Sequence, residues 1–124
     1  MIAVDSSTII PFMAGNRGRD VDTFVTALRA GDVALPPVVL SEVLSDPRLP
    51  REHRGLVLEW PLLNISDGYW IRAAACRATL VSLKLRARLP DVLIAQSCID
   101  HDLALITRDN DFRHFAKHCR LKLA

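Results

Sequence analysis

The chain has 124 residues, half of them hydrophobic, and a formal net charge of +2. This length predicts a single domain, residues 1–124, with enough apolar side chains for a core. No apolar run approaches the roughly 20 residues of a membrane span, and Asp5 interrupts the first run, which argues against a signal peptide. The three cysteines are widely spaced without a CxxC pair. This pattern predicts reduced thiols and a cytoplasmic location.

The first half of the chain alternates short apolar runs with helical patterns. Residues 1–4 and 33–35 are predicted strands, because each is a short apolar run bounded by turn-forming or polar residues. Residues 17–31 carry an apolar stripe at helical spacing and end at a glycine. A proline pair opens an apolar helix over residues 36–44, and a short charged helix follows over residues 50–59.

The second half repeats the alternation. Strands are predicted at residues 62–65 and 104–107, with a further short strand at 121–123. A long helix is predicted over residues 68–88. An almost wholly apolar helix begins at residue 89 and ends near residue 100. Strands that alternate with helices imply an α/β fold, with a central parallel sheet flanked by helices.

Carboxylates occupy related places in this pattern. Asp5 and Asp109 each follow a predicted strand, while Glu42 and Asp91 each lie on an otherwise apolar helix; Asp111 is a fifth candidate. The carboxyl ends of parallel strands meet at one edge of a sheet, where ligands bind.

Convergence of these acids would be costly. Two charges ~4 Å apart repel by roughly 4 kcal/mol at an effective dielectric of 20. A hard divalent cation, Mg²⁺ or Mn²⁺, would compensate this repulsion through all-oxygen ligands. Neutralising one acid, for which Asp91→Asn keeps the side-chain size, is therefore expected to stabilise the metal-free protein.

Each acid also has a simpler interpretation. Asp5 alone is more typical of a helix N-cap. Glu42 could pair with Arg48 or Arg51, although its apolar neighbours favour a functional role. His114 and His118 are four residues apart and could face a zinc ion, but no third ligand lies near them. A Gly-rich phosphate loop and a GxSxG nucleophile motif are both absent from the sequence.

Two stretches of the chain hold cations without any acid. They contain Arg72, Arg77, Lys84, Arg86 and Arg88 in the first stretch and Arg113, Lys117, Arg120 and Lys122 in the second. Such stretches form either solvated helix faces or a basic rim that holds phosphates, and the sequence favours neither.

Four segments carry a resemblance to a known family: residues 3–7 (AVDSS), 40–43 (LSEV), 89–95 (LPDVLIA) and 106–112 (ITRDNDF). Together they resemble the PIN domain, and more closely the VapC-type toxins of bacterial toxin–antitoxin pairs. The resemblance spans the whole chain, and residues 106–112 are its most specific part. Gln96 departs from the family pattern, in which a small residue is usual at that place.

The resemblance implies a PIN domain with four to five parallel strands and the activity of a Mg²⁺- or Mn²⁺-dependent endoribonuclease. It implies that Asp5, Glu42, Asp91 and Asp109 form the catalytic, metal-binding pocket, and that Asp111 is a supporting metal ligand. Ser6 and Thr107 would support these acids through hydrogen bonds. It also implies an RNA substrate, an antitoxin partner and a homodimer. The alternatives are a PIN-fold nuclease of RNA processing or of DNA without an antitoxin, and an inactive module for protein contacts.

Overall fold

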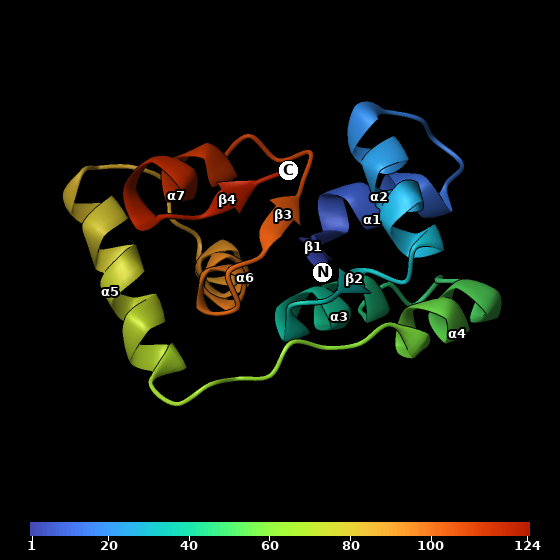
Figure 1. The fold of residues 1–124 in the computed structure, drawn as a ribbon, viewed down its shortest axis with the longest axis horizontal. Helices are drawn as coiled ribbons and strands as arrows, with labels where there is room; N and C mark the ends of the chain where they lie inside the picture. Colours follow the sequence, from blue (N-terminus) through green and yellow to red (C-terminus); the bar gives the residue numbers. More distant parts are fainter.

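The computed structural model describes residues 1–124 and contains a four-stranded parallel sheet in the order β2-β1-β3-β4 (Figure 1). The strands are β1 (Ile2–Val4), β2 (Val33–Ala34), β3 (Ala104–Ile106) and β4 (Lys122–Leu123). The helices are α1 (Ser6–Met13), α2 (Arg19–Arg29), α3 (Pro37–Leu44), α4 (Arg51–Glu59), α5 (Tyr69–Ser82), α6 (Leu89–Asp100) and α7 (Phe112–Cys119). The predicted α/β architecture is confirmed.

The first strand lies in the middle of the sheet. Ala3 pairs with Ala34 of β2 on one side and with Leu105 of β3 on the other. Helix α2 lies against β2 and β3 on one face, whereas α6 and α7 lie against β3 and β4 on the other (Figure 1). All four strands are parallel, so the segments after β1 and β3 leave the sheet at the same edge.

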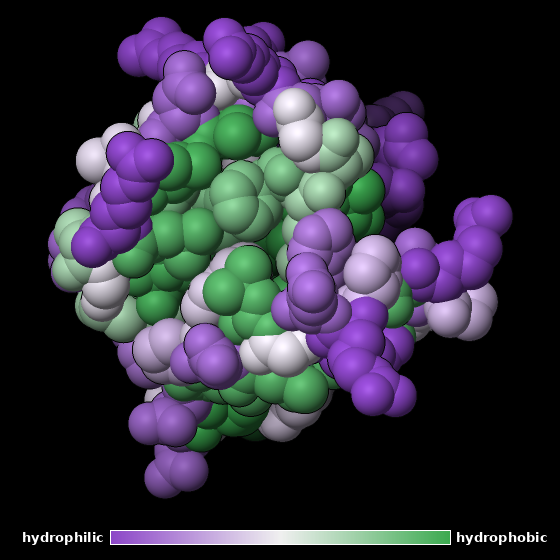
Figure 2. All heavy atoms as spheres, turned by 90° about the vertical axis from the view of Figure 1, so that its right-hand side faces the viewer, coloured by the Kyte–Doolittle hydropathy of each residue, from purple (hydrophilic) through white to green (hydrophobic).

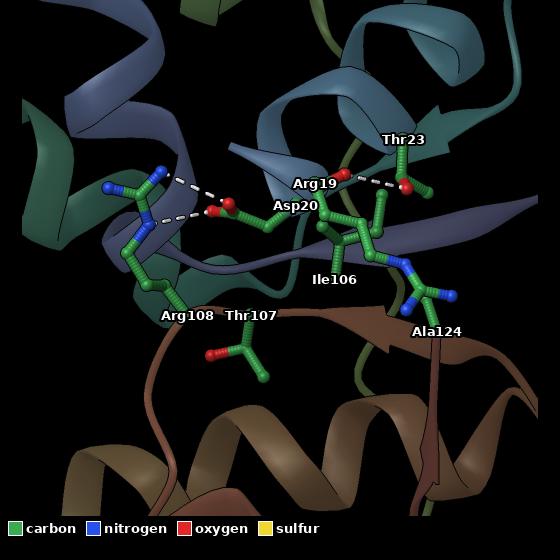
Figure 3. Close-up of a pocket in the computed structure, with 7 residues that line it drawn as sticks. All are labelled: Arg19, Asp20, Thr23, Ile106, Thr107, Arg108 and Ala124. Atoms are coloured by element: carbon green, nitrogen blue, oxygen red, sulfur yellow. Dashed lines mark hydrogen bonds and ion pairs between the residues drawn. The ribbon is translucent and has the colours of Figure 1, made fainter. Parts of the chain in front are cut away.

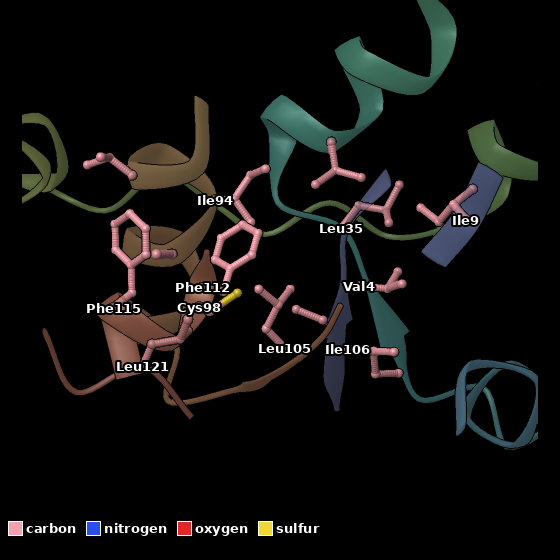
Figure 4. Packing of buried hydrophobic residues seen from close by; sticks show 14 of the residues in the cluster. Val4, Ile9, Leu35, Ile94, Cys98, Leu105, Ile106, Phe112, Phe115 and Leu121 are labelled. Atoms are coloured by element: carbon pink, nitrogen blue, oxygen red, sulfur yellow. The ribbon is translucent and has the colours of Figure 1, made fainter. Parts of the chain in front are cut away.

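One cluster of 22 buried hydrophobic residues forms the core. Val4, Leu105 and Ile106 of the central strands pack between the helices, and Phe112 and Phe115 of α7 cover β3 (Figure 4). Helix α6 is buried from Asp91 to Cys98 except at Leu93, as its apolar sequence predicts. The burial of its central turns fixes the position of the one carboxylate in its first turn.

The predicted strand at residues 62–65 is wrong beyond its first residue. Only Leu62 pairs, as a single parallel bridge to Leu35. The bridge cannot extend, because the residues after Leu35 are Pro36 and Pro37, which lack N–H donors and begin α3. Leu62 and Ile65 are accordingly exposed, and the sheet has four strands.

The long helix predicted over residues 68–88 is also too long at its carboxyl end. Helix α5 ends at Ser82, and Lys84 adopts a left-handed backbone with φ 58°. The Leu85 N–H donates back to the Leu80 carbonyl at 3.0 Å, which closes the helix end. Lys84, Arg86 and Arg88 therefore lie in the connection to α6 rather than on a helix face.

None of the seven helices is both long and apolar enough to span a lipid bilayer. Cys76 and Cys98 are buried and Cys119 is half-buried, and all three are free thiols.

Candidate functional site

Three carboxylates converge at the carboxyl edge of the sheet. One oxygen from each of Asp91, Asp109 and Asp111 lies within 4.8 Å of the other two. Asp91 stands in the first turn of α6, where Pro90 needs no hydrogen-bond partner and the helix dipole favours an anion. Asp109 and Asp111 come from the turn between β3 and α7. The Asp111 N–H donates to the Asp109 carboxylate at 2.9 Å, which fixes the turn.

Asp5 lies behind this cluster, buried at the end of β1. The Ser7 hydroxyl donates to its Oδ1 at 2.7 Å, and the Thr107 hydroxyl donates to its Oδ2 at 2.9 Å. Asp5 occupies the N-cap position of α1, but its side chain makes no capping hydrogen bond. The simple cap interpretation is therefore wrong, because the carboxylate joins β1 to the end of β3 instead.

Burial raises the pKa of Asp5 to about 6, against the two hydroxyl donors that lower it. Repulsion from Asp109 and Glu42 is a smaller contribution in the same direction as burial. Asp5 and Glu42 lie outside the tight group of three, although each is close enough to an acid of that group for repulsion to raise its pKa.

Glu42, on α3, is the most exposed of the five acids. It forms no ion pair with Arg48 or Arg51; instead, the Ser6 hydroxyl donates to its Oε1 at 3.3 Å. Partial desolvation raises the pKa of Glu42, Ser6 opposes this, and Asp91 adds repulsion. Glu42 therefore faces the cluster from its open side.

Two arginines border the acids. The Arg88 guanidinium contacts Asp91 Oδ2 at 3.3 Å and Asp109 Oδ2 at 3.7 Å, while Arg86 contacts Asp111 Oδ2 at 3.7 Å. Burial raises the pKa of Asp91, the Arg88 charge lowers it, and Asp109 and Asp111 raise it again. The sequence analysis placed both arginines in a basic stretch and missed this contact. The spacing of three residues between Arg88 and Asp91 is the signal that predicts it.

Two other cations of that stretch, Arg72 and Arg77, have structural partners, whereas Lys84 is exposed and forms no ion pair. Arg72 binds Asp100 at 2.7 Å, and Arg77 donates to the Ala87 carbonyl at 2.9 Å. The contacts of these two residues are structural, so they fit the interpretation of a solvated helix face better than that of a basic rim that holds phosphates. In the second stretch Lys122 pairs with Asp102, whereas Arg113 is exposed and forms no ion pair.

A polar cavity of about 390 Å³ lies on the other side of Thr107 (Figure 3). Arg19 and Arg108 line it, and Arg108 holds Asp20 of α2 through contacts of 3.0 and 3.1 Å. A smaller cavity of about 160 Å³ adjoins it through Thr107 and Arg108 and reaches Arg113. Three arginines line the two cavities, and the smaller cavity also reaches Asp109 of the cluster.

The donor set fits a hard divalent cation. The oxygens around a six-coordinate Mg²⁺ lie at most about 4.2 Å apart, so the three carboxylates need only a small adjustment to share one ion. His114 and His118 belong to no group of this kind, and the zinc alternative finds no third ligand. The arrangement is suited to Mg²⁺ or Mn²⁺ rather than to Zn²⁺.

Comparisons with known proteins give one family. The PIN domain model matches residues 2–118. Among solved structures, the chain is similar to VapBC2 from Rickettsia felis bound to a DNA fragment from the promoter, with a TM-score of 0.71, 18% identity and coverage of 100% of this chain and 98% of that one. It is also similar to FitAcB from Neisseria gonorrhoeae, with a TM-score of 0.70, 17% identity and coverage of 99% and 96%. No curated protein sequence matches the chain.

Proposed function

Because this chain belongs to the PIN domain family, we propose that it is a metal-dependent endoribonuclease and the toxin of a VapBC-type toxin–antitoxin pair. The observation that carries the proposal is the convergence of Asp91, Asp109 and Asp111 within 4.8 Å, with Asp5 and Glu42 close enough to repel this group. An inactive module for protein contacts would have no need to maintain five mutually repelling carboxylates.

The proposed roles follow from the geometry. Asp91, Asp109 and Asp111 would hold Mg²⁺ or Mn²⁺, with Asp5 and Glu42 completing the acidic pocket. A divalent ion held there would lower the pKa of an attacking water and offset negative charge on the phosphate. Ser7 and Thr107 fix the orientation of the Asp5 carboxylate, and Ser6 does the same for Glu42. The turn after β3 holds Asp109 and Asp111 close together. Their side chains are short, so little conformational freedom is lost when they bind a metal.

The substrate proposal rests on charge. Arg19, Arg108 and Arg113 line the two cavities that share Thr107, so a polyanionic strand could lie along them with one phosphate at the carboxylates. Contacts to phosphates alone favour no base sequence. We therefore propose an RNA strand that is held by its backbone on this side of the cluster.

The experiment that tests the function is cleavage of a structured RNA by the purified protein. We expect cleavage with Mg²⁺ or Mn²⁺ and none with EDTA, because the carboxylates repel the phosphate unless a cation offsets their charge. Single-stranded DNA and a DNA flap of matched length are the comparison substrates. Faster cleavage of either DNA would favour the alternative nuclease, and cleavage that persists in EDTA would refute the metal-dependent mechanism.

The antitoxin has a candidate binding surface beside the pocket. Figure 2 shows apolar side chains gathered on the face formed by α1, α3 and α4, with polar side chains around them. A groove of about 270 Å³ on this face is lined by Ile10, Met13, Val43 and Leu49, and also by Glu42. A partner segment with apolar side chains and a basic one would fill the groove and reach the acids. The homodimer stays a prediction.

This surface gives a test of the toxin proposal. We expect expression of the wild type to arrest growth and Asp91→Asn to be harmless. Co-expression of a small protein encoded beside this gene should relieve the arrest. Ile10→Asp should remain toxic but escape that relief, because Ile10 is 56% exposed in the groove and a charge there opposes apolar docking. Growth that is unaffected by the wild type would contradict the toxin assignment, and full relief of Ile10→Asp would contradict the proposed surface.

A further inference from the structure

Arg88 contacts two carboxylates of the proposed metal site at once. Its Nε lies 3.3 Å from Asp91 Oδ2 and its Nη2 lies 3.7 Å from Asp109 Oδ2. Both acids belong to the group of three whose oxygens lie within 4.8 Å. The guanidinium therefore offsets the charge of two of the carboxylates that a divalent cation would use as ligands.

We propose that Arg88 is a built-in counter-ion of the carboxylate cluster, and that a divalent cation displaces it from Asp91 and Asp109 on binding. This inference rests on the proposed function, since it takes the three acids as metal ligands. A single positive charge and a divalent ion cannot share these oxygens without strong repulsion between them. Metal binding and the Arg88 contacts thus exclude each other.

The surroundings of Arg88 allow the displacement. Its side chain is 53% exposed, and its only acceptors are these two acids. Arg72 is different, because the Asp67 carbonyl and the Ser66 hydroxyl hold it in addition to the Asp100 carboxylate. Arg108 is likewise held by Asp20 and the Arg17 carbonyl. Arg86 is also free to move, since its one contact is with Asp111, but Arg88 is the arginine that contacts two of the acids and can leave both without breaking another contact.

The position of Arg88 would allow it to bind a phosphate of the RNA after the displacement. It directly precedes α6, three residues before Asp91, so a released guanidinium stays at the mouth of the pocket. A phosphate bound at the metal would lie within reach of this guanidinium, because the guanidinium contacts two of the proposed metal ligands. Arg88 would then leave the carboxylates and bind a phosphate of the RNA, which it would help to position. Binding of the metal would in this way favour binding of the RNA backbone.

The test is calorimetric titration of Mn²⁺ into the wild type, Arg88→Ala and Arg88→Lys. We expect Arg88→Ala to bind Mn²⁺ at least about fivefold more tightly, a modest gain because the ion pair is half exposed. Arg88→Lys keeps the charge and should stay within about twofold of the wild type. Lys117→Ala is the matched control, since it removes one exposed cation elsewhere and should also change the affinity by less than about twofold.

Equal or weaker Mn²⁺ binding by Arg88→Ala, with normal binding by the wild type, would overturn this inference and leave the proposed function standing. No binding by either protein would overturn both. An independent readout is the NMR signal of the Arg88 Nε–H group, identified by its loss in Arg88→Lys. We expect this signal to move on addition of Mg²⁺. An unmoved signal, while the amides of Asp109 and Asp111 shift, would contradict the displacement.

Discussion

Replacing Asp91 with asparagine is expected to slow RNA cleavage by about 1000-fold, equivalent to roughly 4 kcal/mol of transition-state stabilisation. Asp91 belongs to the group of three, and it is also coupled to Glu42. The amide keeps the size of the side chain on the buried helix α6 but removes an anionic metal ligand. The measurement is the single-turnover rate on a structured RNA with saturating Mn²⁺.

Asp32→Asn is the matched control for this prediction. Asp32 is exposed and directly precedes β2, so it lies at the opposite edge of the sheet from the cluster. Its replacement should change the rate by less than about twofold, as is usual for surface positions without special contacts. If Asp91→Asn cleaves as fast as the Asp32→Asn control, the carboxylate cluster is not the catalytic site.

The second large effect concerns stability. Asp5→Asn should stabilise the metal-free protein by about 2 kcal/mol at pH 7.5, although most substitutions of buried residues destabilise. The folded state raises the pKa of Asp5 from 3.8 to about 6, so ionisation of this group costs about 3 kcal/mol of folding free energy. The amide has one acceptor oxygen, so only one of the Ser7 and Thr107 hydroxyls can still donate to it, and this loss reduces the gain by about 1 kcal/mol.

The pH dependence has a definite sign. A raised carboxyl pKa means that the folded state binds the proton more tightly than the unfolded state, so the cost is absent well below pH 3.8 and complete above pH 6. Thermal melts in EDTA should show the variant about 8 °C above the wild type at pH 7.5, with most of the difference gone at pH 4. A difference that is independent of pH would contradict an ionised Asp5 as its cause.

The same melts report on the metal. Mn²⁺ at a hundredfold excess over its dissociation constant should stabilise the wild type by about 2.7 kcal/mol. Asp5→Asn should gain less, because part of the repulsion that the ion relieves is already gone. Identical wild-type melting temperatures in EDTA and in Mn²⁺ would show that the acids hold no metal.

The sequence alone favoured Asp91→Asn as the substitution that stabilises the metal-free protein. From the structure we expect Asp5→Asn to stabilise it more. Asp91 has the Arg88 guanidinium beside it, so its replacement also deprives that cation of a partner. Asp5 is buried with only hydroxyl donors. Sequence spacing could place both acids at one sheet edge, but it could not show which of them lacks a cation.

The elements that the sequence predicted well are those with strong local signals. Helix α6 combines Pro90 at its start with an apolar body, and both features act within the helix itself. The strand at residues 62–65 failed because its length depends on Leu35 and the prolines after it, which are distant in sequence. The end of α5 depends on a left-handed residue, Lys84, of a type that seldom adopts this backbone. Contacts such as that of Arg88 with Asp109 need the assembled sheet edge.

The hydrogen bonds between Asp5 and Thr107 join segments about a hundred positions apart, and they set the order in which the pocket can form during synthesis. The Asp5 N–H donates to the Ile106 carbonyl, so β1 has its second neighbour only after β3 has emerged from the ribosome. At translation rates of 5–20 residues per second, Ile106 and Thr107 are synthesised about 5–20 s after Asp5. The high contact order of this pairing also slows folding itself. The nascent chain therefore carries Asp5 and Glu42 for most of its synthesis without an assembled pocket, and the cluster can form only late.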